Sequence, residues 1–208
     1  MADAAHPPAP PTAKQRQKRD SQRKLLAAAR QEFQQHGLAG GRVDRIAELA
    51  GVNKRLIYIY FGDKTGLFDA VIRENRRAIG EAVTFDASDL PAYALRLYEY
   101  WQAHPEAARL YWWRNLERSS TTEYEDAAYT EMVAGIDRAQ HAGRVDPTIP
   151  PPHLFALVLG LLQSWAVPTT TFSAGVDDDE HDRRRASICA AVERLSAPPP
   201  KGRHRRAR

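Results

Sequence analysis

The chain has 208 residues, 43% of them apolar, which is enough to bury the core of one large domain or of two small ones. Its single cysteine, Cys189, excludes an internal disulfide and any paired-cysteine metal site, and no apolar run approaches the roughly 20 residues that a membrane-spanning helix needs. The net charge of +4 has three parts: 15 Lys/Arg against 8 Asp/Glu in residues 1–80, 10 against 18 in residues 81–200, and five Lys/Arg against none in residues 201–208. This asymmetry fits either a polyanion partner for the basic N-terminal part or a fluctuation of solvated charge.

The N-terminal part of the chain predicts a basic arm followed by four helices. Residues 1–18 are expected to form a disordered basic arm, and they lack the charged-then-apolar order of a signal peptide, so we expect a cytoplasmic protein. A helix follows in which apolar residues recur at spacings of three and four, and it ends at the glycines of "HGLAGG". Gly51 ends the next helix, and Asn53 and Asp63 are good N-caps for the two after it. These three helices are expected over residues 43–50, 54–60 and 63–79.

In the rest of the chain apolar residues recur at helical spacing, and no segment shows a convincing strand-like alternation of apolar and polar residues. The predicted fold class is therefore all-α, with about nine helices. Residues 19–80 are expected to form a first domain and residues 81–196 a second, larger one, followed by a disordered basic tail in residues 197–208. Five helices are expected in the larger domain. The first contains Ala94, Leu97, Tyr98 and Trp101 and ends before residues 104–106, and the second contains residues 108–118. The other three are expected at about residues 123–142, 153–167 and 182–195.

The second and third helices describe a helix-turn-helix, because a tight turn at a glycine joins two short helices and the second starts with basic residues. The second helix of such a motif places its N-terminal side chains at base edges in the major groove, while flanking groups hold the phosphates. Lys54 and Arg55 stand at its leading end, where Lys or Arg can reach O6 and N7 of guanine. Tyr58 and Tyr60 can donate hydrogen bonds to phosphates, and Lys64 adds its charge to the positive end of the next helix.

At these positions the stretch "IAELAGVNKRLIYIYFGDKTGLFDAV" resembles the DNA-binding signature of the TetR family of bacterial transcriptional repressors. That signature has Ile-Ala, Ala-Gly-Val, Ser-Lys-x-x-Leu-Tyr-x-His-Phe, a short turn, Lys, and Leu-Phe. The likeness extends over about residues 19–75 and fixes residue types at a dozen positions in three helices. It implies a three-helix DNA-binding domain, a helical ligand-binding and dimerisation domain, and a homodimer that a small-molecule effector releases from a double-stranded DNA operator.

The resemblance also implies roles for individual residues, with three departures from the family pattern. Leu56 occupies a site where Thr often bonds a phosphate. Ile59 either meets a thymine methyl or contacts nothing, and Arg42 replaces the usual cap of the second helix, which either uses another cap or leaves Arg42 for a phosphate. Each of three candidates has an alternative role. Tyr58 could fill a gap between helices, Lys64 could be an ordinary exposed lysine, and Arg55 could face solvent without reading the DNA sequence. The candidate DNA-contacting residues are Arg42, Asn53, Lys54, Arg55, Tyr58, Ile59, Tyr60 and Lys64.

The helix expected over residues 153–167 is apolar on nearly all faces, so it needs cover on every side. Either the protomer covers it alone, or a two-fold partner pairs it with the helix at 182–195 in a four-helix contact. The candidate dimer residues are Phe155, Leu159, Leu162, Ile188, Val192 and Leu195. The aromatic residues in the middle of the chain fit a pocket for a flat or apolar effector, although any one such residue is more often an ordinary core residue. The candidate pocket residues are Tyr98, Trp101, Trp112, Trp113, Tyr129 and Trp165.

No cofactor, metal site, membrane partner or catalytic set is expected. The acidic residues 177–182 suit the N-terminus of the last helix better than a metal ion, and the histidines show no ligand spacing. Cys189 lies beside apolar helix residues and is expected to be a buried, inert thiol. Two alternatives to a specific regulator stay open, a sequence-tolerant architectural DNA-binding protein and a small all-α ligand carrier or enzyme.

Overall fold

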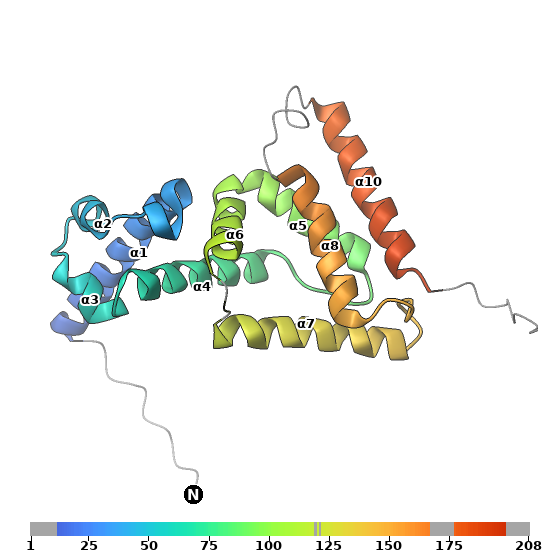
Figure 1. Cartoon of the computed structure of the whole chain (residues 1–208), viewed down its shortest axis with the longest axis horizontal. Helices are drawn as coiled ribbons and strands as arrows, with labels where there is room; N and C mark the ends of the chain where they lie inside the picture. Colours follow the sequence, from blue (N-terminus) through green and yellow to red (C-terminus); the bar gives the residue numbers. More distant parts are fainter. Residues whose placement is uncertain (1–11, 119, 121, 167–176, 199–208) are drawn as a thin grey trace, which may run out of the picture. The chain divides into compact units, whose positions relative to one another are not determined.

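The computed structural model describes residues 12–118, 120, 122–166 and 177–198, and all the regular structure in these ranges is helical (Figure 1). This confirms the predicted all-α fold class. Within the same residues, no helix combines the length and the apolar character that crossing a membrane requires. The nine described helices are α1 (Ala13–Gly40), α2 (Val43–Ala50), α3 (Arg55–Phe61), α4 (Lys64–Ala82), α5 (Leu90–Ala103), α6 (Pro105–Glu117), α7 (Glu123–His141), α8 (Pro151–Ala166) and α10 (Asp178–Ser196).

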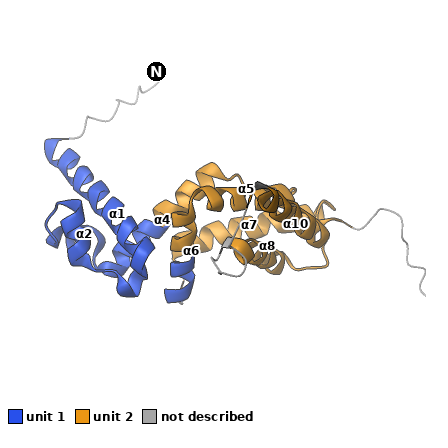
Figure 2. Cartoon of the chain, turned by 90° about the horizontal axis from the view of Figure 1, so that it is seen from above, with its two compact units in different colours: residues 1–72, 112–117 blue, residues 73–111, 118–208 orange. Residues whose placement is uncertain are grey.

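The chain divides into two compact units (Figure 2). Unit 1 comprises residues 1–72 and 112–117, and unit 2 comprises residues 73–111 and 118–208. The division therefore falls inside α4 and α6, so that each of these helices contributes residues to both units. The sequence predicted a boundary near residue 80, and it gave no sign that the end of α6 belongs with the N-terminal helices.

α1 begins earlier than the sequence predicted. Thr12 caps it with a capping box, in which its hydroxyl accepts the Gln15 N–H while the Gln15 side chain accepts the Thr12 N–H. Residues 13–18 are therefore helical and do not belong to a disordered arm, which corrects the predicted arm of residues 1–18. The first 11 residues, and residues 199–208 of the predicted basic tail, lie outside the described ranges.

The core of unit 1 forms where α1, α2, α3 and the first half of α4 turn their apolar faces inward. The rings of Phe33 and Phe68 meet edge to face with their centroids 5.1 Å apart. Ile46 from α2 and Ile57 from α3 are completely buried in this core. Helical spacing also predicted inward positions in α1 and α4, and most of them are buried, namely Leu25, Ala29, Leu67, Val71 and Ile72. Leu26, which the spacing placed on the same face of α1, is half-buried.

Unit 2 packs α5 against α8 and α10, and its helix starts follow ordinary capping chemistry. Asp89 caps α5, which starts at Leu90, by accepting the Ala92 N–H. Asp177 caps α10 by accepting the Glu180 N–H at 2.8 Å. The acidic residues thus lie at the N-terminus of the last helix, as the sequence favoured, but this helix starts at Asp178 and not near residue 182. Cys189 is half-buried on α10, and burial raises the pKa of its thiol, which disfavours the reactive thiolate.

Candidate nucleic-acid interface

The turn between α2 and α3 is built around Gly51. This residue has φ 63° and ψ 35°, a left-handed conformation that glycine adopts without the strain a Cβ would cause. The Val52 N–H closes the helix end by donating to the Ala47 carbonyl at 3.1 Å. The side-chain oxygen of Asn53 accepts the Arg55 N–H at 2.8 Å, so Asn53 holds the first residue of α3. The N-cap position itself is Lys54, one residue later than the sequence predicted, and Lys54 makes no side-chain cap.

α3 buries one apolar residue in the core and leaves its opposite face exposed. A seven-residue helix has too few hydrogen bonds to persist alone, so the buried side chain of Ile57 holds it in place. Arg55 is exposed, and Tyr58 and Ile59 keep 48% and 59% of their surface exposed. The outer face of α3, defined as Arg55, Tyr58 and Ile59, therefore offers a guanidinium, a phenol and an apolar side chain to a partner.

Tyr60 differs from Tyr58 because it lies half-buried. Its ring meets Phe61 edge to face, with the centroids 6.3 Å apart. The Lys18 ammonium from α1 lies 5.7 Å from the centroid of the Tyr60 ring, within the range of a cation–π contact. Tyr60 thus joins α3 to the basic start of α1.

Lys54, which the sequence placed among the base contacts, forms an ion pair in the structure. Its ammonium lies 2.7 Å from the carboxylate of Asp44 in the first turn of α2, and that hydrogen bond raises the pKa of Lys54. Both side chains are well exposed, so solvent screens the pair. A partner that draws Lys54 away must replace the Asp44 carboxylate with another anion.

Lys64 has a structural role that the sequence did not predict. Its ammonium donates to the carbonyls of Ala39 and Gly41, at 3.3 and 3.2 Å, in the corner between α1 and α2. An ammonium has three N–H donors, so one is left for a phosphate. Arg42 at the start of α2 makes no side-chain cap, and its exposed side chain fits the second of the two roles that the sequence left open.

The start of α2 is held by Glu32 of α1. This carboxylate, only 7% exposed, accepts the Arg42 N–H at 2.8 Å and the Nε of the Arg45 guanidinium at 2.9 Å. Burial raises the pKa of Glu32, but the hydrogen bonds from Arg45 and from the Arg42 N–H outweigh burial and hold the pKa below its ordinary value. Sequence inspection missed Glu32 and Asp44, because their partners lie ten or more residues away and meet them only after the turns form.

Two family descriptions match the chain. "Bacterial regulatory proteins, tetR family" matches residues 25–71, and "Tetracyclin repressor-like, C-terminal domain" matches residues 89–194, just over half of the chain. The chain belongs to the TetR family. The resemblance found in the signature around Gly51 is therefore confirmed, and this TetR-family protein is a DNA-binding transcription regulator, not an enzyme.

Named relatives cover most of this TetR-family chain. The HTH-type transcriptional repressor SCO4008 of Streptomyces coelicolor is 34% identical over 179 residues, covering 83% of this chain and 93% of the relative. The HTH-type transcriptional regulator RutR of Escherichia coli K12 is 30% identical over 153 residues, covering 68% and 72%. Among solved structures, the transcriptional regulator SCO4942 from Streptomyces coelicolor has a TM-score of 0.72 and 33% identity, covering 86% of this chain and 99% of that one.

Two of the six aromatic residues predicted for the effector pocket of this TetR-family protein are buried in unit 2. Tyr98 is completely buried, its ring stacks on His181, and its hydroxyl lies 3.4 Å from the Nδ1 of that histidine. Trp101 packs against Tyr111 with the ring centroids 5.4 Å apart. The indole N–H of Trp101 is buried, and no acceptor for it lies among the described residues. Within the described residues of unit 2, the Trp101 indole is therefore a buried donor without an acceptor.

The other four predicted pocket residues do not join Tyr98 and Trp101 in the interior of unit 2. Trp112 and Trp113 belong to unit 1, Tyr129 is 41% exposed at the side of Phe155, and Trp165 is half-buried near the end of α8. The spacing of apolar residues along a helix predicts that a ring lies inward, but it does not predict which neighbouring helix covers that ring. In the described part of the chain, hollows of about 430 and 580 Å³ lie between α1 and α2 and between residues 85–88 and α7, and none of the six aromatics lines either.

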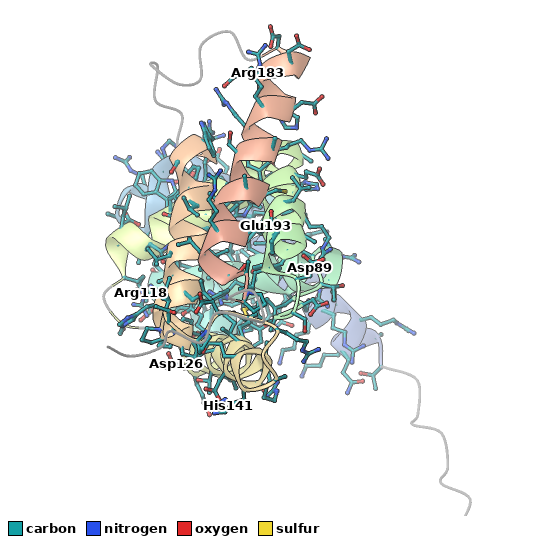
Figure 3. All side chains as sticks on the ribbon, turned by 90° about the vertical axis from the view of Figure 1, so that its right-hand side faces the viewer. Asp89, Arg118, Asp126, His141, Arg183 and Glu193 are labelled. Atoms are coloured by element: carbon teal, nitrogen blue, oxygen red, sulfur yellow. The ribbon has the colours of Figure 1, made fainter. Side chains whose placement is uncertain are left out.

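The structure also corrects the predicted dimer residues of the TetR-family chain. Four of the six are at most 3% exposed within the protomer, in which α8 packs against α5 and α7, and α10 packs against α5 and α8. These four are Phe155, Leu162, Ile188 and Val192, whereas Leu159 and Leu195 are half-buried. α8 and α10 lie side by side, and the charged side chains of Arg183 and Glu193 are exposed on α10 (Figure 3).

Proposed function

We propose that this TetR-family regulator is a repressor that binds a double-stranded DNA operator as a homodimer and leaves it when a small-molecule effector binds unit 2. The observation that carries the proposal is the uncovered outer face of α3, since Arg55, Tyr58 and Ile59 are exposed while Ile57 anchors the helix. A helix held in this way can enter the major groove without leaving its own core. Because an operator is chromosomal, we expect the regulator to act in the cytoplasm.

The DNA contacts divide into base contacts and phosphate contacts. We assign Arg55 to a guanine, because its guanidinium can bond O6 and N7 together, and Ile59 to a thymine methyl. Tyr58 donates its hydroxyl to a phosphate. Further phosphate contacts come from cationic or polar groups in or beside α3, which are Arg42, Asn53, Lys54, Tyr60 and the third N–H of Lys64.

Different observations support the proposed repression and the proposed dimer. Several relatives are named repressors, including SCO4008 and the NicS protein of Pseudomonas putida. A two-fold dimer matches two half-sites about one DNA turn apart. We place the dimer face on the exposed stripe of α8 and α10, where Leu157 is 47% exposed and small residues allow close approach. The small residues of that stripe are Ala156, Gly160, Ala186 and Ser187.

The effector is the least defined partner. The buried indole N–H of Trp101, which has no acceptor in the described part of the chain, favours a compound with a hydrogen-bond acceptor, and the rings of Tyr111 and Tyr98 favour a flat apolar body. Titration of candidate compounds into the protein–operator complex tests the switch. Release that is lost in Trp101→Phe supports the site, and release that persists in this variant places the effector elsewhere.

Selection of bound oligonucleotides from a random pool tests the function itself. We expect the full-length protein to enrich a two-fold symmetric sequence and to keep that sequence at moderate salt in the presence of unrelated DNA. An architectural DNA-binding protein would enrich no sequence and would lose its DNA as salt rises. A chain that enriches nothing therefore contradicts the proposal and favours the architectural alternative.

A further inference from the structure

α1 is broken at Gly37, and the break is closed by side chains that lie 76 and 80 residues further along the chain. Gly37 has φ 65° and ψ −172°, which no helix contains, and the chain resumes a helical turn at Leu38. In an unbroken helix the Leu38 N–H would donate to the Gln34 carbonyl. Here the Leu38 N–H donates to the Glu117 carboxylate, and the Gln34 carbonyl accepts the indole N–H of Trp113 at 3.2 Å.

The two side chains that close the break come from one face of one helix. Trp113 and Glu117 are four residues apart near the end of α6, so they project from the same face. The other oxygen of the Glu117 carboxylate accepts the Ala39 N–H at 3.2 Å. A carboxylate that receives two backbone N–H groups at the start of a helical turn is a strong cap. We define this group of contacts, from Trp113 and Glu117 to residues 34–39, as the α6 clasp.

The fit of the clasp is close. A Cβ added to Gly37 would lie 2.7 Å from the Trp113 ring and 2.8 Å from a carboxylate oxygen of Glu117, so only glycine leaves room for both. The positive φ also makes glycine the favoured residue at this position. Backbone conformation and packing thus depend on the same residue.

The clasp joins the corner that presents the helix-turn-helix. Directly after the clasped N–H groups come the carbonyls of Ala39 and Gly41, which bind the Lys64 ammonium, and the carbonyl of Gly40, which lies 3.3 Å from Arg45 Nη2. α2 begins two residues later. The direction in which α2 and α3 leave α1 is therefore fixed by groups from α1, α2, α4 and α6 together.

We propose that Trp113 and Glu117 are positioning residues of the DNA-binding unit, which hold the α1–α2 corner in the conformation that binds the operator. This inference rests on the proposed function. The same helix supplies Ala107, Ala108 and Leu110 to the core of unit 2, and the buried side chain of Asn75 donates to the Ala107 carbonyl at 3.1 Å.

Binding linkage gives a test that needs no effector. If the clasp strengthens operator binding, the operator must stabilise the clasp by the same factor. We expect bound operator to slow hydrogen exchange of the Leu38 and Ala39 amides about tenfold in the wild-type protein. We expect Glu117→Gln to weaken operator binding about tenfold and to leave both amides fast with or without DNA.

Matched variants separate the clasp from general effects. Glu106→Gln neutralises an exposed glutamate on the same helix, and Trp112→Phe removes an indole N–H that has no acceptor among the described residues. Trp113→Phe should weaken operator binding more than Trp112→Phe does. Should Glu117→Gln fail to fold, the exchange measurement on the wild-type protein and the comparison of the two tryptophan variants still decide the matter.

The outcomes are distinct. A wild-type protein that enriches an operator, while Glu117→Gln binds it as tightly as Glu106→Gln does, overturns the inference alone. So does an operator that leaves the exchange of Leu38 and Ala39 unchanged. A wild-type protein that enriches no operator overturns the proposed function, and the inference falls with it.

Discussion

The ammonium of Lys54 and the carboxylate of Asp44 lie 2.7 Å apart, so an ion pair bridges α2 and the residue before α3. Operator DNA would bring phosphates to the same place, and the phosphates and Asp44 would then compete for Lys54. We predict that Asp44→Asn strengthens DNA binding and makes the plot of log affinity against log salt steeper by about 0.9, the slope expected for one more phosphate contact. Fluorescence anisotropy at several salt concentrations measures both quantities.

Glu131→Gln is the matched control for this change, since Glu131 is also an exposed carboxylate in an ion pair, with Arg138 at 3.0 Å. It lies in unit 2 and should leave the salt slope unchanged. An Asp44→Asn protein with the wild-type slope would show that Lys54 stays away from the phosphates.

Tyr58 provides a test of the phosphate contacts. Its hydroxyl is removed in Tyr58→Phe, which keeps the ring, and we expect operator affinity to fall about fivefold because a hydrogen bond is worth about 1 kcal/mol. Tyr124, which is 42% exposed on α7, gives the matched control Tyr124→Phe. Equal affinities for the two variants in an electrophoretic or anisotropy assay would exclude a hydroxyl contact from Tyr58.

Glu32 predicts how stability depends on pH. Its pKa is lower in the folded chain, so the folded state binds this proton less tightly than the unfolded state does. The stabilisation is therefore fully present above the ordinary glutamate pKa, about 4.3, and is lost as the pH falls through the lower folded value. Urea unfolding between pH 3 and 7 should show this loss in the wild-type protein and a smaller one in Glu32→Gln. Identical profiles would mean that Glu32 is not held as described.

Leu157 tests the dimer face. A charge at this exposed position of α8 would be buried against a partner chain, so Leu157→Glu should shift the protein from dimer to monomer in sedimentation velocity. Leu116, which is 78% exposed on α6, serves as the control position through Leu116→Glu. If Leu157→Glu sediments as the wild-type protein does, the dimer face lies elsewhere.

The sequence predicted the structure best for features that depend on residues within a single helix or turn. Apolar spacing identified the inward residues of α1 and α4, Gly51 marked the turn, and Asn53 and Asp63 marked helix starts, because each depends on residues within a turn or two. The family signature then predicted α3 as the helix that enters the major groove.

The sequence predicted the structure least well for contacts between segments that are far apart along the chain. Trp113 was predicted as a pocket residue because it is aromatic, yet its indole binds a carbonyl of the broken α1. The carbonyls that Lys64 binds are exposed to it only because Gly37 and Gly41 redirect the chain. Likewise, the apolar residues of α8 and α10 could not reveal which of them the neighbouring helices cover. Long-range pairing of this kind leaves no periodic mark in a sequence.

The central claim is that α3 lies in the major groove with Arg55 on a guanine, and methylation interference on the selected operator tests it most directly. Methylation of guanine N7 blocks the acceptor that Arg55 would use. We predict that one methylated guanine in each half-site prevents binding by the wild-type protein, and that Arg55→Ala becomes indifferent to methylation at that guanine. Binding that tolerates N7 methylation at every guanine, or an interference pattern that Arg55→Ala leaves unchanged, would contradict the account.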